Sequence, residues 1–577
     1  MRKRIMPVIV ALVFVIVVGL IAVCTALVQK YTPSKERADL QKYYNLTEED
    51  DMAIILNNQK TEELCKYMNG HAYLTYEFVH DRLNQRFYWD ANENILRYTT
   101  PTDVISVDAG STDYYVTKEK NTEDYVIVQV DGDIMYLAVD FVQKYTNIDF
   151  KLEENPNLLL LTSEWGEIQT ATVKKDTQIR EKGGIKSPIV ADVEKGAVVT
   201  IIETIQEWSR VCTADGRIGY LKNKTLEDRT TQNISREFQE PKFTHILKEE
   251  KINMAWHQVT NADANSQVAN VLQTTKGVNV LSPTWFYLND NKGNIKSLAS
   301  SSYVSYCHQN GIEVWALFSN LENPDVDTTA VLTHTSTRDY LTNQIISAAI
   351  EYDLDGVNLD FEELSGSVGD AYIQFIRELS IKCKNNGIIL SVDNYVPSSY
   401  TAFYNRAEQA VFADYVIVMA YDEHYNGSEE GSVASIGFVT EGVEATMKEV
   451  PAEQLIIGMP FYTRVWECIP KTEEVSELEE ASEDYVPYTV ESSAVGMREA
   501  ENRISINEAE KVWSEADGQY YAEYVNGGNT YKIWLEDEKS MELRLQLMKE
   551  KKVAGAAFWK LGLEKSSIWD VIIKYIN

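Results

Sequence analysis

The chain has 577 residues, a formal net charge of −34 and 44% hydrophobic residues. That length suits about two to four domains, each with a real core. The acidic excess excludes nucleic acid as an expected partner, because phosphate binding needs clusters of basic side chains.

The N-terminus has the pattern of a transmembrane segment. Three basic residues (2–4) precede an uncharged apolar stretch, residues 5–28, which would span about 36 Å as a helix and could cross a bilayer. We expect residues 1–28 to be an uncleaved signal anchor, with the rest of the chain outside the cell membrane. Cleavage after Ala26 is the alternative. Cys24 follows Val23, which makes a poor lipoprotein signal.

Two small modules are expected before the main domain. Residues 29–70 are polar and read as a stalk, and residues 71–165 contain a weak internal repeat in which residues 73–79 align with residues 136–142. A duplicated strand-helix-strand spacer would explain that repeat. Residues 166–228 carry short alternating segments and hairpin signals such as Asp215-Gly216.

The second of these modules resembles the small bacterial SH3-like barrel. The residues that carry the resemblance are Arg180, Gly196, Trp208, Gly219 and Tyr220. Such modules often bind cell-wall peptides, so the resemblance implies a wall-binding role. The alternative reading is that Trp208 and Tyr220 only fill a core.

From about residue 243 the pattern alternates between strands and helices. Between the strand candidates lie helical stripes such as the apolar positions of residues 372–383. Eight strands separated by helices predict an α/β fold, a (β/α)8 TIM barrel. The strand candidates are residues 252–256, 278–282, 313–318, 356–361, 388–392, 415–420, 455–459 and 554–559.

An unusually long segment separates the last two predicted strands. It contains an acidic run at residues 473–484 and a strand-like segment at residues 531–535. We expect a small α+β insertion at about residues 467–552, beside the active face. A calcium site in the acidic run is the less favoured reading, because charge runs are usually solvated.

Residues 353–364 carry the strongest chemical signal. Alternation places Asn358, Asp360 and Glu362 on one side of a strand, with the Cα atoms of Asp360 and Glu362 about 6.6 Å apart. Two carboxyls that close do not both ionise freely, so one pKa should rise toward that of a general acid. The alternative is a strand end with a solvated face.

Other polar and aromatic residues follow later strands, at the end where barrel enzymes place their active sites. Acids, tyrosines and a tryptophan at one barrel mouth indicate a sugar site, in which aromatic faces stack on pyranose rings. Singly, each residue could be ordinary core or strand. The candidates are Tyr421, Asp422, Tyr462, Arg464 and Trp559.

These motifs resemble family-18 glycoside hydrolases over residues 243–577. Residues 355–362 look like the family's DGxDxDxE signature, residues 419–422 like its MxYD motif, and Trp559 like its terminal-strand tryptophan. Asn358 departs from the pattern, since many chitinases carry Asp there; it could still hydrogen-bond Asp360 but not share a proton with it. The Asn form is similar to the branch of spore-germination and cell-wall N-acetylglucosaminidases.

The resemblance implies substrate-assisted retaining catalysis, an exception to the two-carboxylate scheme. Glu362 would protonate the glycosidic oxygen while the substrate's own 2-acetamido oxygen attacks the anomeric carbon. Asp360 would orient the acetamide, Tyr421 would hydrogen-bond its oxygen, and Trp559 would floor the subsite. The residues expected to bind sugar are Asn358, Asp422, Tyr462, Arg464 and Trp559.

The resulting hypothesis is a membrane-anchored extracytoplasmic hydrolase of β-1,4 bonds in N-acetylglucosamine-containing glycans, with peptidoglycan favoured over chitin. A chitinase is the nearest alternative. A non-catalytic glycan-binding protein is another, although such proteins typically lack the acid that Glu362 supplies. The six cysteines and seven histidines are scattered without metal-ligand spacing, so we expect no metal and no cofactor.

Overall fold

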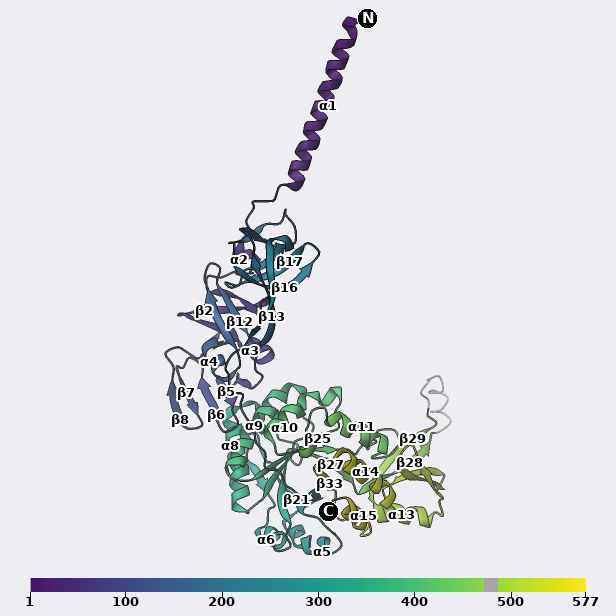
Figure 1. Ribbon diagram of the computed structural model, residues 1–577. Coiled ribbons are helices and arrows are strands. Elements are labelled where there is room, and N and C mark those ends of the chain that lie inside the picture. The colour runs from purple at the N-terminus through teal and green to yellow at the C-terminus, as the bar shows by residue number, and fades with distance from the viewer. Residues whose placement is uncertain (1, 472–485, 577) are drawn as a thin grey trace. The chain divides into compact units, whose positions relative to one another are not determined.

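The computed structural model describes residues 2–471 and 486–576 (Figure 1). The chain divides into two compact units. The N-terminal unit comprises residues 1–89 and 106–240, and the barrel unit comprises residues 90–105 and 241–577.

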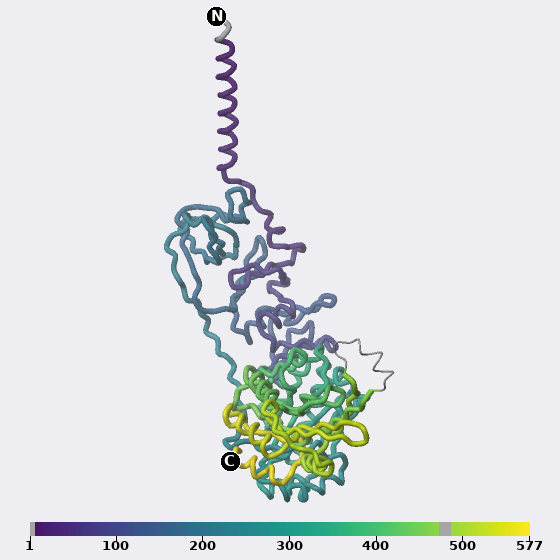
Figure 2. The backbone as a smooth tube through the Cα atoms, turned by 90° about the vertical axis from the view of Figure 1, so that its right-hand side faces the viewer, coloured from purple at the N-terminus to yellow at the C-terminus, as the bar shows by residue number. Residues whose placement is uncertain are grey.

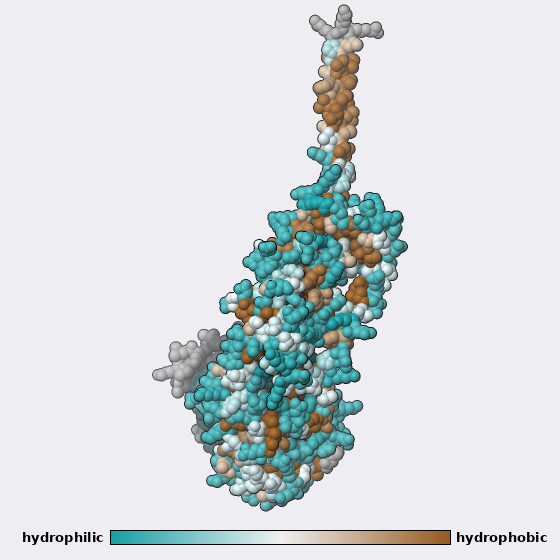
Figure 3. All heavy atoms as spheres, turned by 90° about the vertical axis from the view of Figure 1, so that its left-hand side faces the viewer, coloured by the Kyte–Doolittle hydropathy of each residue, from teal (hydrophilic) through white to brown (hydrophobic). Residues whose placement is uncertain are grey.

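The N-terminal unit begins with a long apolar helix, α1 (Arg2–Tyr31). Its segment Met6–Tyr31 is long and apolar enough to span a membrane, and none of it is buried against the protein. The hydrophobic surface of this helix is continuous in Figure 3. Both an anchor and a signal sequence have these properties.

A seven-stranded sheet in the order β15-β14-β18-β17-β16-β13-β19 follows in the same unit. Its core contains Val173, Ile179, Val211 and Leu221. The strands are β13 (Gly166–Val173), β14 (Thr177–Arg180), β15 (Ile189–Val193), β16 (Val198–Ile205), β17 (Trp208–Thr213), β18 (Ile218–Lys222) and β19 (Leu226–Ile234), with a short 3-10 turn, η1 (Asn223–Thr225).

The chain just after α1 is part of this module, where the sequence predicted a stalk. Residues 33–46, purple in Figure 2, lie beside the teal strands of the module. Arg37 forms a β-bridge with Ile189, and the hydroxyl of buried Tyr44 donates to the carbonyl of Gly216. The segment includes a short helix, α2 (Leu40–Tyr43). Apolar side chains interspersed among the polar ones therefore pack this segment against the module, and it is not a free stalk.

A second sheet, ordered β11-β12-β1-β2-β3-β10-β9, contains the repeat seen in the sequence. Each copy is a strand followed directly by a helix: β3 (His71–Thr75) with α3 (Tyr76–Arg82), and β10 (Ile134–Ala138) with α4 (Val139–Tyr145). The two repeated strands pair antiparallel, with Leu74 opposite Leu137. β1 and β2 lie within the range predicted as a stalk. The other strands are β1 (Asp51–Leu56), β2 (Gln59–Met68), β9 (Val128–Asp131), β11 (Asp149–Glu153) and β12 (Leu158–Thr162), and a hairpin of β7 (Asp113–Val116) and β8 (Glu119–Thr122) also belongs to the unit.

The barrel unit is built on a closed ring of parallel strands, which confirms the predicted TIM barrel. β20 pairs with β33 on one side and with β21 on the other, so the ring has no open edge. Large apolar side chains such as Trp256, Trp315 and Ile417 fill its interior. The strands are β20 (Ile252–His257), β21 (Val280–Leu288), β23 (Glu313–Ser319), β24 (Gly356–Asp360), β25 (Ile389–Tyr395), β26 (Tyr415–Met419), β27 (Leu455–Pro460) and β33 (Gly555–Trp559), and β22 (Ile295–Ser297) pairs antiparallel with β21.

Helices follow most of the barrel strands. The predicted apolar stripe on α9 is buried, and the helix ends just before Gly387, whose φ of +69° favours glycine. The helices are α5 (Val268–Leu272), α6 (Ser301–Gln309), α7 (Thr328–Thr333), α8 (Thr335–Glu351), α9 (Gly369–Asn385), α10 (Arg406–Phe412), α11 (Ile436–Thr446), α14 (Glu538–Lys551) and α15 (Ile568–Ile576).

The insertion between β27 and β33 is a five-stranded antiparallel sheet with one helix. It starts at Tyr462, two residues after the end of the seventh barrel strand. The acidic run at residues 473–484 lies outside the described residues. The elements are β28 (Tyr462–Pro470), β29 (Tyr488–Gly496), α13 (Met497–Ile506), β30 (Lys511–Ser514), β31 (Gln519–Asn526) and β32 (Asn529–Leu535).

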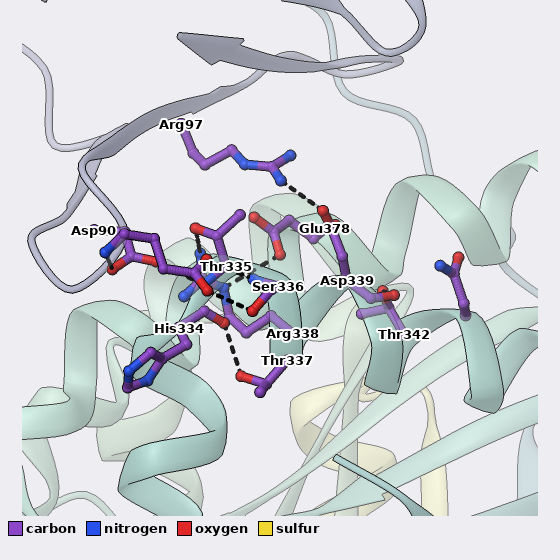
Figure 4. Close-up of polar contacts among 12 residues, drawn as sticks. Asp90, Arg97, His334, Thr335, Ser336, Thr337, Arg338, Asp339, Thr342 and Glu378 are labelled. Carbon is purple, nitrogen blue, oxygen red and sulfur yellow. Dashed lines mark hydrogen bonds and ion pairs between the residues drawn. The ribbon is translucent and has the colours of Figure 1, made fainter. Parts of the chain in front are cut away.

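Residues 90–105, which include β5 (Ile95–Thr99), pack on the barrel helices although they are far away in sequence. The backbone N–H of Thr335 donates to the Asp90 carboxylate over 2.5 Å (Figure 4). The N–H of Ser336 donates to Glu93 over 2.8 Å. These N–H groups open helix α8, whose own N-cap residue supplies no side-chain hydrogen bond. Two carboxylates from a distant segment therefore cap α8.

Candidate active site

The motif strand β24 directs Asn358 into the barrel, where its side-chain amide is fully hydrogen-bonded. Asn358 Oδ1 accepts from Trp256 Nε1 (2.9 Å) and Ser282 Oγ (3.0 Å). Asn358 Nδ2 donates to Ser391 Oγ (3.2 Å) and Asp393 Oδ1 (2.8 Å). Gly356 earlier in the strand is needed because a Cβ there would lie 2.7 Å from the Trp315 ring.

Asp360 ends β24, and its Oδ1 is buried without a hydrogen-bond partner among the described residues. Burial raises the pKa of the Asp360 carboxyl well above its usual value, and the charges of Asp393, Glu362 and Glu322 raise it further. The sequence predicted a raised pKa for one carboxyl of this pair; at Asp360 the charge of Glu362 contributes to the rise, after burial and the charge of Asp393.

Glu362 lies two residues after the end of β24. Its backbone is hydrogen-bonded to Asn320, which follows β23. Asn320 Oδ1 accepts from the Glu362 N–H and Asn320 Nδ2 donates to the Glu362 carbonyl, both over 2.9 Å. Burial raises the pKa of the Glu362 carboxyl, a hydrogen bond from the Tyr395 hydroxyl opposes the rise, and the charges of Glu363, Asp422 and Glu322 add to it. A raised pKa suits a general acid.

Tyr421 and Asp422 lie two and three residues after the end of β26, close to the carboxyl group of Glu362. The charge of Asp422 contributes to the raised Glu362 pKa, and burial, followed by the charges of Tyr462, Asp393, Asp360 and Glu362, raises the Tyr421 pKa. Tyr462 OH donates to Asp422 Oδ1 over 2.5 Å. The rings of Tyr421 and Tyr462 meet edge to face at 6.3 Å.

Trp559 and Arg464 complete the set of predicted residues. The Trp559 ring lies edge to face against Trp256 at 5.8 Å, the same Trp256 that donates to Asn358. Arg464 Nη1 donates to Ser492 Oγ over 3.1 Å within the insertion sheet, and its charge acts on Tyr462. The eight predicted residues are thus linked by contacts or nearby charges, with Asn358 inside the barrel and Arg464 on the insertion strand β28.

Three residues that contact this cluster were not predicted: Asp393, Tyr395 and Asn320. The predicted fifth strand ends at Val392, whereas β25 continues to Tyr395. The inward alternation of Ser391, Asp393 and Tyr395 is the signal that would have found two of them. Asn320 follows the third strand without a distinguishing pattern.

One cluster of carboxylates in the described residues has oxygen atoms close enough to share a metal ion. It comprises Glu48, Asp50 and Asp51 of the N-terminal unit. The ammonium of Lys66 contacts all three carboxylates, so this cluster is an ion-pair network.

A closed α/β barrel with a pair of raised-pKa carboxyls and tyrosines at its carboxyl-end mouth is the architecture of a glycoside hydrolase. The chain belongs to the glycosyl hydrolases family 18, whose family model matches residues 217–564. A bacterial SH3 domain model matches residues 175–227, which confirms the predicted SH3-like module.

Several curated relatives share this region. The uncharacterized glycosylase YvbX of Bacillus subtilis is 26% identical over 297 residues, 49% of this chain and 81% of that protein. The cortical fragment-lytic enzyme of Bacillus subtilis is 26% identical over 275 residues, 45% of this chain and 59% of that protein. This chain therefore spans little more than half of the latter relative.

A solved structure shares the fold. The spore cortex-lytic enzyme SleL of Bacillus cereus superimposes with a TM-score of 0.50 at 19% identity, covering 60% of this chain and 79% of that one. At this identity the likeness supports the fold alone.

Proposed function

We propose that this chain is a membrane-anchored, extracytoplasmic glycoside hydrolase that cleaves β-1,4 bonds next to N-acetylglucosamine, with peptidoglycan as its substrate. The observation that carries the proposal is the carboxyl pair at the end of β24. Asp360 and Glu362 both have raised pKa values and face a mouth that also holds Tyr421.

Each side chain has a role in this mechanism. Protonated Glu362 gives its proton to the glycosidic oxygen as the bond to the anomeric carbon breaks. The substrate's acetamide oxygen forms the new bond to that carbon, and ionised Asp360 stabilises the resulting oxazolinium. Glu362 then removes a proton from the water that opens the ring, which restores the acid.

Sugar binding falls to the remaining predicted residues. Tyr421 hydrogen-bonds the acetamide oxygen, and Trp559 lies beneath the pyranose ring as an apolar floor. Asp422, held by Tyr462, and Arg464 bind hydroxyl groups. Asn358 lies deeper in the barrel than the carboxyl groups and holds their cluster in place. The apolar helix α1 and the SH3-like module support a substrate in the cell wall rather than free chitin.

The test of this function is the substitution Glu362→Gln in the full-length chain. We expect the release of reducing ends from peptidoglycan to fall by about 100- to 10,000-fold, as for loss of a general acid, with KM little changed. Glu363→Gln is the matched control, since Glu363 is the adjacent, exposed carboxylate, and it should keep activity within a few-fold.

Three other outcomes would change the assignment. Faster cleavage of chitin oligomers than of peptidoglycan would make the chain a chitinase. Equal inactivity of wild type and Glu362→Gln on every N-acetylated glycan, with glycan binding retained, would make it a binding protein. Activity that survives Glu362→Gln would show that another residue is the acid.

A further inference from the structure

We propose that Asp393, on β25, is a positioning residue for catalysis that shares one proton with Asp360 across the two neighbouring strands. Nothing in the chain's similarity to other proteins assigns this residue a role. The inference rests on the function proposed above and extends it from a carboxyl pair to a set of three.

The strand register places the two carboxyls beside each other. β24 and β25 are parallel, with Asn358 opposite Ser391 and Leu359 opposite Val392. The next pair in that register is Asp360 and Asp393. Neighbouring strands are about 4.8 Å apart, and alternate side chains point to the same face. Both carboxyls therefore point into the barrel in one layer.

The amide of Asn358 fixes Asp393 rather than Asp360. Because Trp256 Nε1 is only a donor, it must meet the oxygen of the amide, which determines the amide's orientation. Both amide hydrogens are then taken, by Ser391 and by Asp393. The sequence-based expectation that Asn358 hydrogen-bonds Asp360 is wrong, since no amide hydrogen remains for it.

The polar group beside Asp360 is therefore the carboxyl of Asp393. Its Oδ1 is buried without a hydrogen-bond partner, and Asp393 is 2% exposed. Among the described residues, no ion pair to Lys, Arg or His involves either carboxyl. Burial raises the pKa of both groups. Two such carboxyls cannot both ionise, so the stable form of the pair holds one proton.

This shared proton gives Asp360 two states without changing the charge of the pair. In the free enzyme the proton lies between the carboxyls, and Asp360 is largely neutral beside Glu362. When the oxazolinium forms, the proton moves fully to Asp393 and Asp360 takes the negative charge that faces the cation. The proton returns when water opens the ring. The pair has one proton and one negative charge throughout.

The experiment compares pH profiles of kcat/KM and kcat on N-acetylated glycan for wild type and Asp393→Asn in the full-length chain. A pair that shares a proton has a depressed lower pKa. Loss of Asp393 should therefore move the acid limb of the profile to higher pH by about one unit, and lower kcat about 10- to 100-fold with KM within a few-fold.

The rescue variant is Asn358→Asp combined with Asp393→Asn, which moves the third carboxyl from β25 to β24. We expect it to return the acid limb toward the wild-type position. A folded double variant that keeps the profile of Asp393→Asn overturns the proposal, as does an acid limb that Asp393→Asn leaves unmoved. Should Asp393→Asn fail to fold, Asp393→Ser removes the carboxyl differently and must give the same shift.

Two controls separate this inference from the proposed function. Asp414→Asn removes a buried carboxyl that accepts from Leu390 and Ile246 N–H groups at the opposite end of the strands, and should lower stability without moving the pH profile. Glu362→Gln is run in parallel. If the wild type is active, Glu362→Gln is inactive and Asp393→Asn leaves the acid limb unmoved, only the role of Asp393 is overturned. An inactive wild type overturns both.

Discussion

Three carboxyl groups, Asp360, Glu362 and Asp393, lie close enough at the barrel mouth to act on one another's charge. Their folded-state pKa values are raised, so folding favours their protonated forms. Their contribution to stability is fully present below about pH 4, the unfolded range, and is lost as pH rises through the folded values. At neutral pH these buried carboxyls therefore lower the free energy of unfolding.

Replacing one of these carboxyls should stabilise the protein only at high pH. We expect Asp393→Asn to have a free energy of unfolding above that of wild type by about 1 kcal/mol at pH 8. At pH 4 the two should be alike or the variant slightly less stable. Thermal unfolding of both proteins at the two pH values checks this, and a difference that does not depend on pH would contradict it.

The hydrogen bond from Tyr462 to Asp422 should matter for binding rather than for chemistry. Asp422 has φ of +55°, a conformation uncommon for a residue other than glycine, which fits a side chain aimed at a ligand. We expect Tyr462→Phe to raise KM about five-fold, the effect of about 1 kcal/mol, with kcat nearly unchanged.

The matched control for this variant is Tyr521→Phe. Tyr521 also donates to a carboxylate, Glu523, over 2.6 Å, but on strand β31 of the insertion. It should leave both constants unchanged. Loss of kcat at constant KM in Tyr462→Phe would instead place Tyr462 in the chemical step.

Among the secondary-structure elements, helix α8 depends on a segment more than 200 residues earlier in the chain. Asp90 and Glu93 accept from its first backbone N–H groups, and Arg97 pairs with Asp339 on the same helix at 2.6 Å. Because α8 packs against α9, which follows strand β24, this contact supports the frame of the candidate site.

Removing the cap should therefore destabilise the barrel unit. We expect Asp90→Ala to lower the free energy of unfolding by about 1–2 kcal/mol, the usual effect of losing a helix cap. Denaturant unfolding of the full-length chain measures it. Asp108→Ala, an exposed aspartate on β6 (Val104–Asp108), should change stability by less than about 0.5 kcal/mol; equal effects of the two substitutions would argue against the capping role.

The strand elements and the carboxyl motif could be predicted from the sequence because both depend on local periodicity. Alternation marked β24 and its polar face, and apolar runs marked the other barrel strands. The role of residues 90–105 could not be predicted, because the helix that they cap lies more than 200 residues later in the chain and no local sequence pattern indicates such a contact. Asp393 was missed for a smaller reason: three residues at the end of β25 were polar, and the predicted strand stopped before them.

For the whole molecule, the fate of helix α1 determines whether the protein stays at the membrane. We propose that it anchors the chain, because its apolar segment is long and preceded by basic residues. The expected result is that the protein stays in the membrane fraction after a high-salt wash and has the mass of the uncleaved chain. Release in soluble form with a new N-terminus at Leu27 would show that α1 is a signal peptide.

The identity of the nucleophile is best tested by combining the stereochemistry of the first product with the need for the substrate's acetyl group, because a carboxylate nucleophile would also retain configuration. In the mechanism we propose, Glu362 is the acid, Asp360 is a stabilising carboxyl, and the substrate supplies the attacking oxygen. Proton NMR of a reaction with N-acetylated oligosaccharide should therefore show the β-anomer first, and the same oligosaccharide without acetyl groups should not be cleaved. Initial release of the α-anomer, or equal cleavage of the deacetylated substrate, would contradict this mechanism.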